Sequence, residues 1–491
     1  MKQKPILAFL FTLATALMQA QQLPVDIGLN LTTGYNSPEV PFWMRSNQFG
    51  SLPSSGFSAG LTGSIHKNYS PTPKKFDWGI GAEARFNAGE GSGKSTVEPP
   101  SWFTLIEGYG KIKYGIFELM AGRAKDVTGL HDTLLSSGSW SVSGNALGIP
   151  KIQLSIPDYY TIPWFDGLFS IKGTYAHGWL ESKTYFLQQS LYGRMGKPNW
   201  KLNLYGGFNH QAVWGDERNR FNHEDYELNF LQTIYYVNLG KAYNNGEIKA
   251  TRVGNHLGSI DMALSYDFTG VRLFIYRQFI YDAGALYYLA NLRDGLTGLS
   301  IANRKDVERN LQWNRFVIEF LYTKNQAGET WSPETTSPYE NYYNNSYYPK
   351  GWSYMESGIG NPFISNDAYL KDGFPRASGQ AFHNNRIALF HAGFDIDLYK
   401  WNILCKLSYS KNYGHYLTAK NGKIWDGGIN HDEPDGIFPE TEQFSGYLSS
   451  VRELKKGMHI GIQIALDQGG LYENCAGIMA TVGKDGRFGE F

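Results

Sequence analysis

Three histidines and two aspartates are the side chains of this chain that could support metal or acid–base chemistry. His177, His210 and His256 each stand in a short polar motif, and Asp216 and Asp261 follow two of them closely. Imidazoles and a carboxylate are common zinc ligands, but these histidines lie tens of residues apart and show no metal-binding spacing. We therefore interpret the five residues as a buried polar network, and we expect no metal or other cofactor.

A hydrolase arrangement is a second interpretation of the same region. His256 and Ser259 would suit the base and nucleophile of a lipase or esterase, with Asn209 or Asp261 orienting the imidazole. Residues three positions apart on a strand point to opposite faces, however, so the pair would need a bend. The paired carboxylates of a glycosidase are defined by their separation in space, which the sequence does not give. We expect no catalytic residues.

Residues 341–355 gather five tyrosines and one tryptophan. The tyrosines come mostly as doublets, and Pro349 and Gly351 interrupt a strand ladder, so the rings cannot all face lipid from one strand. Such rings can lie against the C–H faces of sugars, or they can pack together into a rigid cap. Both interpretations stay open. The glycan-binding candidates are Tyr342, Tyr343, Asn345, Tyr347, Tyr348, Trp352 and Tyr354.

The elements that must position these residues are strands. Apolar and polar residues alternate with a period of two in residues 77–87, 259–268, 388–398 and 459–467, as expected where each strand has one apolar and one polar face. Further strand candidates lie near 25–33, 57–67, 103–121, 167–179, 200–209, 270–280, 313–323, 399–410 and 475–483.

The strand pattern favours a membrane barrel over a soluble sandwich. The alternating segments have about the ten residues that a tilted strand needs to cross a bilayer, and their apolar faces often carry an aromatic residue near one end. A spanning sheet must close because lipid cannot satisfy unpaired backbone groups. We predict an all-β, closed antiparallel barrel of about 18 strands. The polar network would then lie inside the barrel and hold its plug.

The amino terminus predicts export. Lys2 and Lys4 precede an apolar run and a small-residue cleavage region, so residues 1–20 are expected to be a signal peptide and residues 21–491 a single barrel domain. We expect the outer membrane of a Gram-negative bacterium. The formal net charge of zero gives no footprint for nucleic acid. Cys405 is interpreted as a small apolar side chain, although a disulfide with Cys475 stays open.

Some segments do not show the strand period. Short helices are predicted near 182–194, 282–292 and 301–311. Lys484, Asp485 and Gly486 resemble a turn, which leaves the closing strand open. Loops are predicted at 87–101, 215–230, 324–386 and 412–447, and the largest would face the cell exterior.

Several segments, taken in order, resemble the Wzi family of capsule assembly proteins. They are Tyr-Ala-His-Gly-Trp-Leu-Glu (175–181), Asn-His-Gln-Ala-Val-Trp-Gly (209–215), Gly-Asn-His-Leu-Gly-Ser-Ile-Asp (254–261), Tyr-Arg-Gln-Phe (276–279), Arg-Asp-Gly-Leu-Thr-Gly (293–298) and Gly-Trp-Ser-Tyr-Met-Glu-Ser-Gly-Ile-Gly-Asn-Pro-Phe (351–363). The resemblance implies an outer-membrane barrel with a small helical cap or plug on the periplasmic side. It also implies a non-catalytic, lectin-like role, without assigning sugar-binding residues.

The expected function is therefore to attach or organise capsular or exopolysaccharide at the cell surface. The alternative is a diffusion porin, because a large barrel can leave an aqueous channel. The expected partners are the polysaccharide and outer-membrane lipid, with the polysaccharide export machinery as a further candidate. We expect a monomer and no nucleic acid.

Overall fold

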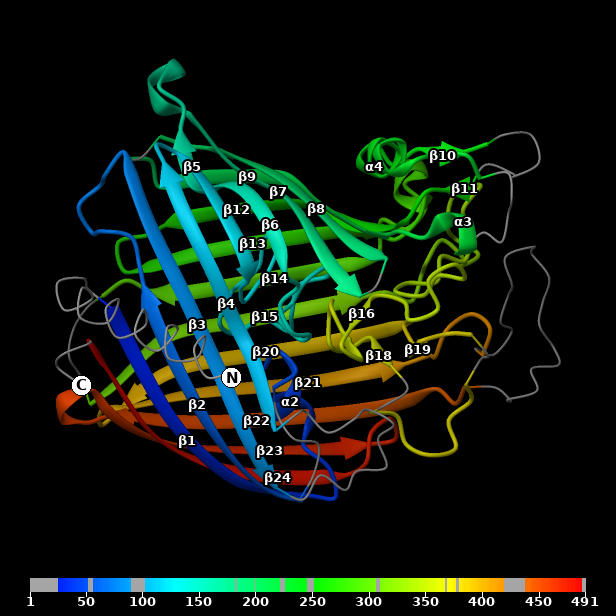
Figure 1. Ribbon diagram of the computed structural model, residues 1–491. Helices are drawn as coiled ribbons and strands as arrows, with labels where there is room; N and C mark the ends of the chain where they lie inside the picture. Colours follow the sequence, from blue (N-terminus) through cyan, green and yellow to red (C-terminus); the bar gives the residue numbers. More distant parts are fainter. Residues whose placement is uncertain are drawn as a thin grey trace, which may run out of the picture.

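The computed structural model describes residues 25–487 except 52–55, 90–101, 182, 198, 221–225, 245–250, 306–309, 367–368, 377–378 and 419–437. The predicted signal peptide lies outside the described residues. Eighteen antiparallel strands form one closed sheet (Figure 1). They are β1 (Val25–Ser37), β2 (Gly56–Lys67), β3 (Phe76–Gly89), β4 (Phe103–Tyr114), β5 (Phe117–Arg123), β6 (Lys151–Thr161), β7 (Phe169–Glu181), β8 (Thr184–Met195), β9 (Leu202–Trp214), β12 (Asn255–Asp267), β13 (Val271–Tyr281), β14 (Gly295–Asn303), β15 (Leu311–Tyr322), β20 (Ile387–Leu398), β21 (Trp401–Asn412), β22 (Thr441–Glu453), β23 (Met458–Gly469) and β24 (Cys475–Arg487).

The barrel closes between its first and last strands. β1 pairs with β24 from Asp26 opposite Arg487 to Ser37 opposite Ala476. The prediction of a turn at Lys484–Gly486 is therefore wrong, because these residues belong to the closing strand. With every strand paired on both sides, the sheet has no open edge to lipid.

The apolar strand faces point outward. On β12, Ile260 and Met262 are 43% and 57% exposed, whereas the alternating Ser259 and Asp261 are fully buried toward the lumen. This arrangement is the inverse of a soluble sandwich, and it is the one that a lipid-facing barrel requires. Among the described residues, no helix is long and apolar enough to cross a membrane.

The two ends of the barrel differ in their connections. The end that holds Val25 and Arg487 has short turns such as 115–116, 268–270 and 399–400. Most connections at the other end, which is on the right in Figure 1, are long, including 124–150, 215–254 and 323–386. Long loops of such barrels face the cell exterior. We call this the outer end and the short-turn end the inner end.

Among the described residues, every α-helix belongs to a connection of the outer end. The helices are α2 (Phe42–Arg45), α3 (Glu217–Arg220) and α4 (Phe230–Asn238), and α2 enters the lumen from the outer end as part of the plug. The expected helical plug is therefore present, but it enters from the outer end rather than from the periplasmic side. The single-turn 3₁₀ segments are η1 (Trp164–Gly167), η2 (Ala285–Tyr288) and η4 (Lys455–Gly457). Three small hairpins complete the outer loops: β10 (Ala242–Tyr243) with β11 (Thr251–Arg252), β16 (Ser353–Tyr354) with β17 (Ser357–Gly358), and β18 (Ser365–Asn366) with β19 (Phe382–Asn384).

The prediction of a helix near 182–194 is wrong, because β8 (Thr184–Met195) occupies this segment. Phe186 and Leu187 are both almost fully buried, so the outer part of the strand is covered on both faces. A strand covered on both faces loses its apolar–polar alternation. The segment 282–292 contains only the single turn η2. Of the segment 301–311, residues 301–303 belong to β14 and residue 311 to β15, and no helix is present in its described part. β6 and β14 were not predicted, and β22 begins inside the predicted loop 412–447.

Outer-end segments fold back into the lumen and form a plug. Residues 124–150 are held by two strand carboxylates. Glu319 accepts hydrogen bonds from Ser136 Oγ (2.7 Å) and the Ser137 amide (2.6 Å), and Asp261 accepts one from the Leu130 amide (2.9 Å). The segment around α2 enters beside them, where the Phe42 amide donates to Asp467. Cys405 and Cys475 are free thiols, so the disulfide left open by the sequence is absent.

Candidate functional site

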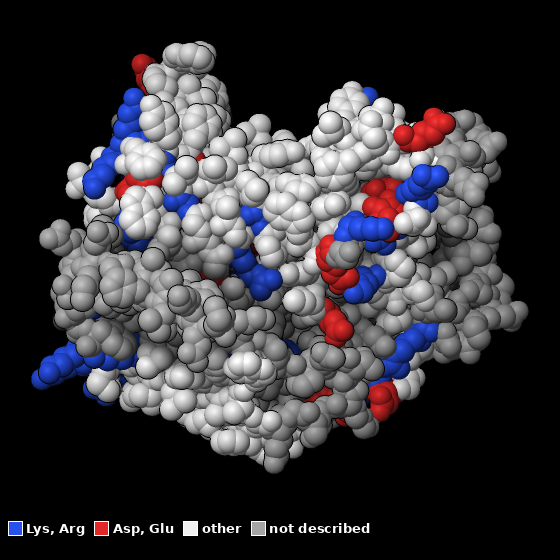
Figure 2. Space-filling model, in the orientation of Figure 1, with Lys and Arg blue, Asp and Glu red and all other residues white. Residues whose placement is uncertain are grey.

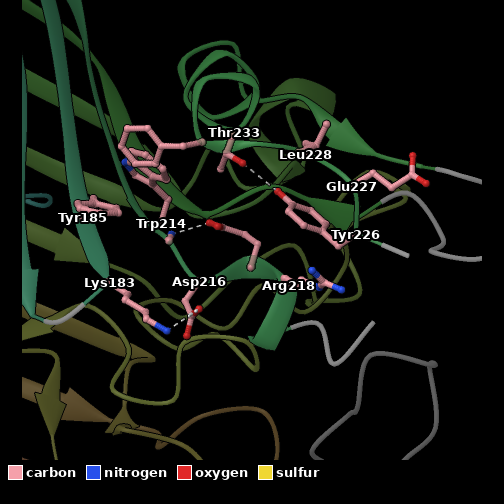
Figure 3. Close-up of a pocket in the computed structure, with 12 residues that line it drawn as sticks. Lys183, Tyr185, Trp214, Asp216, Arg218, Tyr226, Glu227, Leu228 and Thr233 are labelled. Atoms are coloured by element: carbon pink, nitrogen blue, oxygen red, sulfur yellow. Dashed lines mark hydrogen bonds and ion pairs between the residues drawn. The ribbon is translucent and has the colours of Figure 1, made fainter. Parts of the chain in front are cut away.

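A cavity of about 570 Å³ lies at the outer end, between the ends of β8 and β9 and the first part of the 215–254 connection (Figure 3). It combines aromatic rings with side chains of both charges. Its lining residues are Lys183, Tyr185, Trp214, Gly215, Asp216, Glu217, Arg218, Tyr226, Glu227, Leu228, Phe230 and Thr233. We call this cavity the outer pocket.

An aromatic wall forms one side of the outer pocket. Tyr185 on β8 is paired directly with Trp214 on β9, and their ring centroids are 4.8 Å apart. Phe230 is the first residue of α4. Its ring centroid lies 5.6 Å from that of Trp214 and 5.7 Å from that of Tyr185. A capping box between Asn229 and Gln232 fixes this helix start. Phe230 is half exposed, so the wall presents a ring to solvent.

Charged and amide side chains form the rim of the outer pocket. Lys183 Nζ lies 3.8 Å from Asp216 Oδ1, which also accepts a hydrogen bond of 2.8 Å from Asn219. Arg218 and Glu227 are exposed on the same rim. Figure 2 shows acidic and basic side chains intermixed on this side of the outer end. The rim therefore offers both donors and acceptors to a polar, uncharged or weakly charged ligand.

The floor of the outer pocket is tied to the tyrosine-rich loop. Glu217 is buried and accepts hydrogen bonds from the Gly215 amide and from the Tyr348 hydroxyl, the latter at 3.0 Å. Burial raises the pKa of Glu217 above its ordinary value. Arg220 donates to Gly215 O (2.8 Å), Thr184 Oγ1 (2.9 Å) and Tyr347 O (3.1 Å), and its guanidinium carbon lies 4.5 Å from the centroid of the Tyr348 ring. Residues 323–386 thus support the pocket from below.

Five of the seven predicted glycan-binding residues are buried in the part of the plug that the 323–386 loop forms, which we call the outer plug. Tyr342, Tyr343, Tyr348, Trp352 and Tyr354 belong to one apolar core together with Trp140. Tyr343 illustrates the packing, because its hydroxyl donates to Trp140 O and accepts from the Asn361 amide at 2.7 Å. Asn345 and Tyr347 are half-buried. The rings of the five buried residues close the outer plug, which is the cap interpretation of this stretch.

The structure separates the residues of the predicted interior network. Asp261 faces the lumen and accepts hydrogen bonds from the plug and from Tyr192. His210 and His256 hydrogen-bond each other at 3.0 Å, and His210 also contacts the Tyr281 hydroxyl at 2.6 Å. The two histidines share the outward strand face with Phe208 and Ile260, so an interior location is wrong for them.

His177 and Asp216 also lie outside the lumen. His177 shares the outward face of β7 with the exposed Trp179 and packs beside its ring at 5.1 Å between centroids. Asp216 follows the end of β9 with a positive φ of 60° and stands on the rim of the outer pocket. The lumen-facing partners of the plug include Asn209, whose amide donates to Thr128 Oγ1 at 2.9 Å. A strand period defines two faces, but it does not say which face is inside.

No catalytic arrangement is assembled from the hydrolase candidates. His256 and Ser259 lie on opposite faces of β12, as their spacing predicts. A Gly-x-Ser-x-Gly pattern, Gly56–Gly60, lies inside β2 rather than at the strand-to-helix turn of a nucleophile elbow. Within the described ranges, no group of three or more His, Cys, Asp or Glu side chains could hold a metal ion.

Sequence reasoning missed the aromatic wall of the outer pocket. Trp214 stood in a recognised motif, and Asn229–Gln232 has the spacing of a capping box directly around Phe230. These signals locate a strand end and a helix start, but they do not bring the two together. The wall depends on α4 folding back over β8, where Gln189 donates a hydrogen bond of 2.8 Å to Asn238.

A closed 18-stranded barrel with an apolar outer face and a plugged lumen defines a β-barrel protein of the Gram-negative outer membrane. A family model described as capsule assembly protein Wzi matches residues 28–389. The chain belongs to this family of capsule assembly proteins.

Two solved structures are similar to this chain, and the first of them supports the barrel fold. One is Wzi, an outer-membrane protein involved in group 1 capsule assembly in Escherichia coli and described as a carbohydrate-binding β-barrel. It is 12% identical, with a TM-score of 0.57, over 96% of this chain and 87% of that one. The other is the outer-membrane protein OprD from Pseudomonas aeruginosa, 8% identical with a TM-score of 0.46 over 95% of this chain and 93% of that one. A comparison with curated protein sequences gives no match.

Proposed function

We propose that the protein holds capsular or exopolysaccharide at the cell surface by binding sugar units in the outer pocket, without catalysing a reaction. The observation that carries this proposal is the aromatic wall of Tyr185, Trp214 and Phe230 beside the charged rim at the outer end. The pocket volume of about 570 Å³ falls in the range of small-ligand sites.

The chemistry of the outer pocket suits a carbohydrate. The C–H face of a pyranose can lie against the half-exposed Phe230 ring, while sugar hydroxyls exchange hydrogen bonds with Asp216, Lys183 and Arg218. Asn345 and Tyr347, the two predicted glycan contacts that are half-buried rather than buried, are proposed as secondary contacts. The five buried members of that set would act through packing, because they have no ring to offer at the surface.

Outer-membrane lipid is proposed as a second partner, through α4. The helix lies on the outward face of the barrel wall, where Val237 packs in one cluster with Leu187 and Ala212. Its opposite side exposes Leu231, Tyr235 and Leu239, with Leu231 74% exposed. An apolar helix face of this kind, beside the lipid-facing strands, fits the interface of the outer leaflet. A monomeric state and docking of export machinery at the inner end remain predictions of the sequence.

The proposed function is tested by capsule retention. A deletion strain should release polysaccharide into the medium, and the wild-type gene should restore the cell-bound fraction. Phe230→Ala should leave the barrel folded, because this ring is half exposed, yet it should lower both retention and the binding of purified protein to the isolated polysaccharide. Trp313→Ala is the matched control, since Trp313 is an exposed ring near the inner end of β15. Unchanged retention in the deletion strain would refute the function.

A further inference from the structure

A second cavity, of about 300 Å³, lies inside the barrel near its inner end. It is separate from the outer pocket and shares no lining residue with it. Its lining comes from strands β6, β9, β12, β13, β14 and β15 and from the plug: Leu130, His131, Asp132, Thr133, Tyr159, Tyr205, Ser265, Arg272, Phe274, Ser300, Ala302 and Arg315. We call this cavity the vestibule.

The strand positions place the vestibule on the inner side of the plug. Tyr159 is near the last residue of β6, Tyr205 near the first residue of β9, and Arg272 near the first residue of β13, all at the inner end. The plug closes the other side of the cavity, because Asp132 accepts hydrogen bonds from Ser300 Oγ at 2.8 Å and from Arg315 at 3.1 Å. A ligand of the vestibule would therefore come from the periplasm rather than from the cell exterior.

Aromatic rings line one side of the vestibule. The centroids of Tyr159 and Tyr205 are 5.7 Å apart, and those of Tyr205 and Phe274 are 6.1 Å apart. The three rings form a continuous apolar surface at the edge of a larger apolar cluster in the lumen. Such a surface can accept the C–H face of a sugar ring.

Four cationic side chains surround these rings, and three of them have acidic neighbours. Arg272 and Arg315 are each neutralised by an ion pair, with Asp267 at 2.6 Å and Asp132 at 3.1 Å. Lys172 and Arg194 lie 5.0 Å and 5.5 Å from the centroid of the Tyr159 ring. Lys172 is attracted by Asp158 and Asp261. Arg194 donates to Ser170 Oγ and forms no ion pair in the part of the chain that the structure describes. An anionic group in the vestibule would compensate Arg194.

Two buried polar atoms at the vestibule are left without a hydrogen-bond partner among the described residues. They are the Tyr159 hydroxyl and Nδ1 of His131, whose side chain is about nine-tenths buried. Buried polar atoms are normally paired in proteins. Both atoms belong to lining residues of the cavity, so hydroxyl groups of a ligand could supply the missing partners.

We propose that the vestibule binds a single carboxylated sugar unit of the hexuronate class. The aromatic surface takes the sugar ring, Tyr159 and His131 bond its hydroxyls, and Arg194 beside Tyr159 attracts its carboxylate. The proposal goes beyond binding at the cell surface, and it stands or falls without the outer pocket.

The test uses the full-length protein in detergent and isothermal titration with D-glucuronate, D-glucose and acetate. Glucuronate should bind, and glucose and acetate should each bind at least about tenfold more weakly, since glucose lacks the carboxylate and acetate lacks the ring and its hydroxyls. Tyr159→Phe should weaken glucuronate binding about fivefold, as expected for one lost hydrogen bond. This change removes an atom that has no partner in the described protein, so the fold should be unaffected.

Two further variants locate the binding. Tyr160→Phe is the matched control, because the next residue of β6 faces outward, and it should bind glucuronate like the wild type. Ala302→Leu should narrow the vestibule and weaken binding strongly. Equal binding by Tyr159→Phe and Tyr160→Phe, or equal affinity for glucose and glucuronate, would overturn the proposal. So would binding that survives Ala302→Leu but is lost in Phe230→Ala, because it would then belong to the outer pocket.

Discussion

The Tyr348 hydroxyl donates a hydrogen bond of 3.0 Å to the Oε1 atom of Glu217. This contact joins two outer-end connections that are far apart in the sequence, the 215–254 segment and the 323–386 loop. Arg220 strengthens the same junction, since it donates to Tyr347 O and stacks on the Tyr348 ring. The tyrosine-rich stretch therefore influences the outer pocket without contributing its own buried rings to the pocket lining.

Tyr348→Phe should weaken polysaccharide binding in the outer pocket. The substitution keeps the ring but removes one donor to the buried Glu217 carboxylate, which leaves α3 less well held. A loss of roughly 1–2 kcal/mol at this junction is expected, with about a thirtyfold rise in Kd as the upper bound. Titration of the purified protein with the isolated polysaccharide measures the change. Tyr399→Phe, at an exposed position of the inner end, should have no effect.

Replacing Tyr347, Tyr348 and Trp352 together by Ala should lower the stability of the outer plug. Trp352 is fully buried and its indole nitrogen donates to Ser141 O at 2.8 Å, so its truncation leaves a cavity and an unpaired acceptor. Large-to-small changes at such sites cost about 3–5 kcal/mol. Hydrogen exchange of residues 323–386 should rise sharply. Unchanged exchange together with lost glycan binding would instead indicate direct contact between these rings and sugar.

The apolar–polar alternation of a strand can be recognised in the sequence wherever one face of the strand contacts lipid and the other faces the lumen, as along 259–268. It failed at β8, where α4 covers Leu187 from outside and removes the contrast between the faces. The outward location of His210 and His256 could not be predicted either. Their polar side chains suggested the lumen, whereas on the outward face a loop covers them. Nor could the outer pocket be predicted, since Tyr185, Trp214 and Phe230 meet through tertiary packing.

The outer plug should become less stable as the pH rises from about 4 to about 7. Asp294 accepts hydrogen bonds from the Gln326 amide and the Tyr342 hydroxyl, both at 2.7 Å, and burial raises its pKa to about 7. Burial also raises the pKa of Glu340 to about 7. Each carboxyl is protonated in the folded loop over a pH range in which it is ionised in the unfolded chain. The folded state therefore binds more protons, and its stability falls through this window.

Asp294→Asn isolates this effect, because an amide does not titrate. Hydrogen exchange of residues 323–386 is measured for both proteins between pH 4 and pH 8, and the wild-type rate is divided by the variant rate at each pH. The quotient of the two rates should rise up to about pH 7 and then level off. Its total rise should correspond to a change on the order of 2–4 kcal/mol in the free energy of opening of the loop. A quotient that stays constant across this range would contradict the raised pKa.

Leu231 on α4 should be in contact with lipid. A nitroxide label at Leu231→Cys, in a Cys405→Ala, Cys475→Ala background, should be accessible to oxygen and protected from a water-soluble nickel complex in liposomes. Ser346→Cys is the control, since Ser346 is exposed on the outer loop. If the Leu231 label is as accessible to the nickel complex as the Ser346 label, the apolar face of α4 does not lie in the membrane.

Glu319→Ala should open a conducting path through the barrel. Glu319 accepts hydrogen bonds from Ser136, from the Ser137 amide and from Tyr276, so it fixes the 124–150 plug segment to β15. Removing a charged acceptor from these buried donors costs about 1.5–3 kcal/mol for each bond, enough to populate states in which the plug has left the lumen. Planar bilayers should show no stable channel with the wild type and intermittent steps with the variant. Ile318→Ala, on the opposite face of the same strand, should behave like the wild type, because it makes no contact with the plug across the wall. Large, stable steps from the wild-type protein would mean that the plug does not seal the lumen, and they would favour the porin alternative over a closed, glycan-holding barrel.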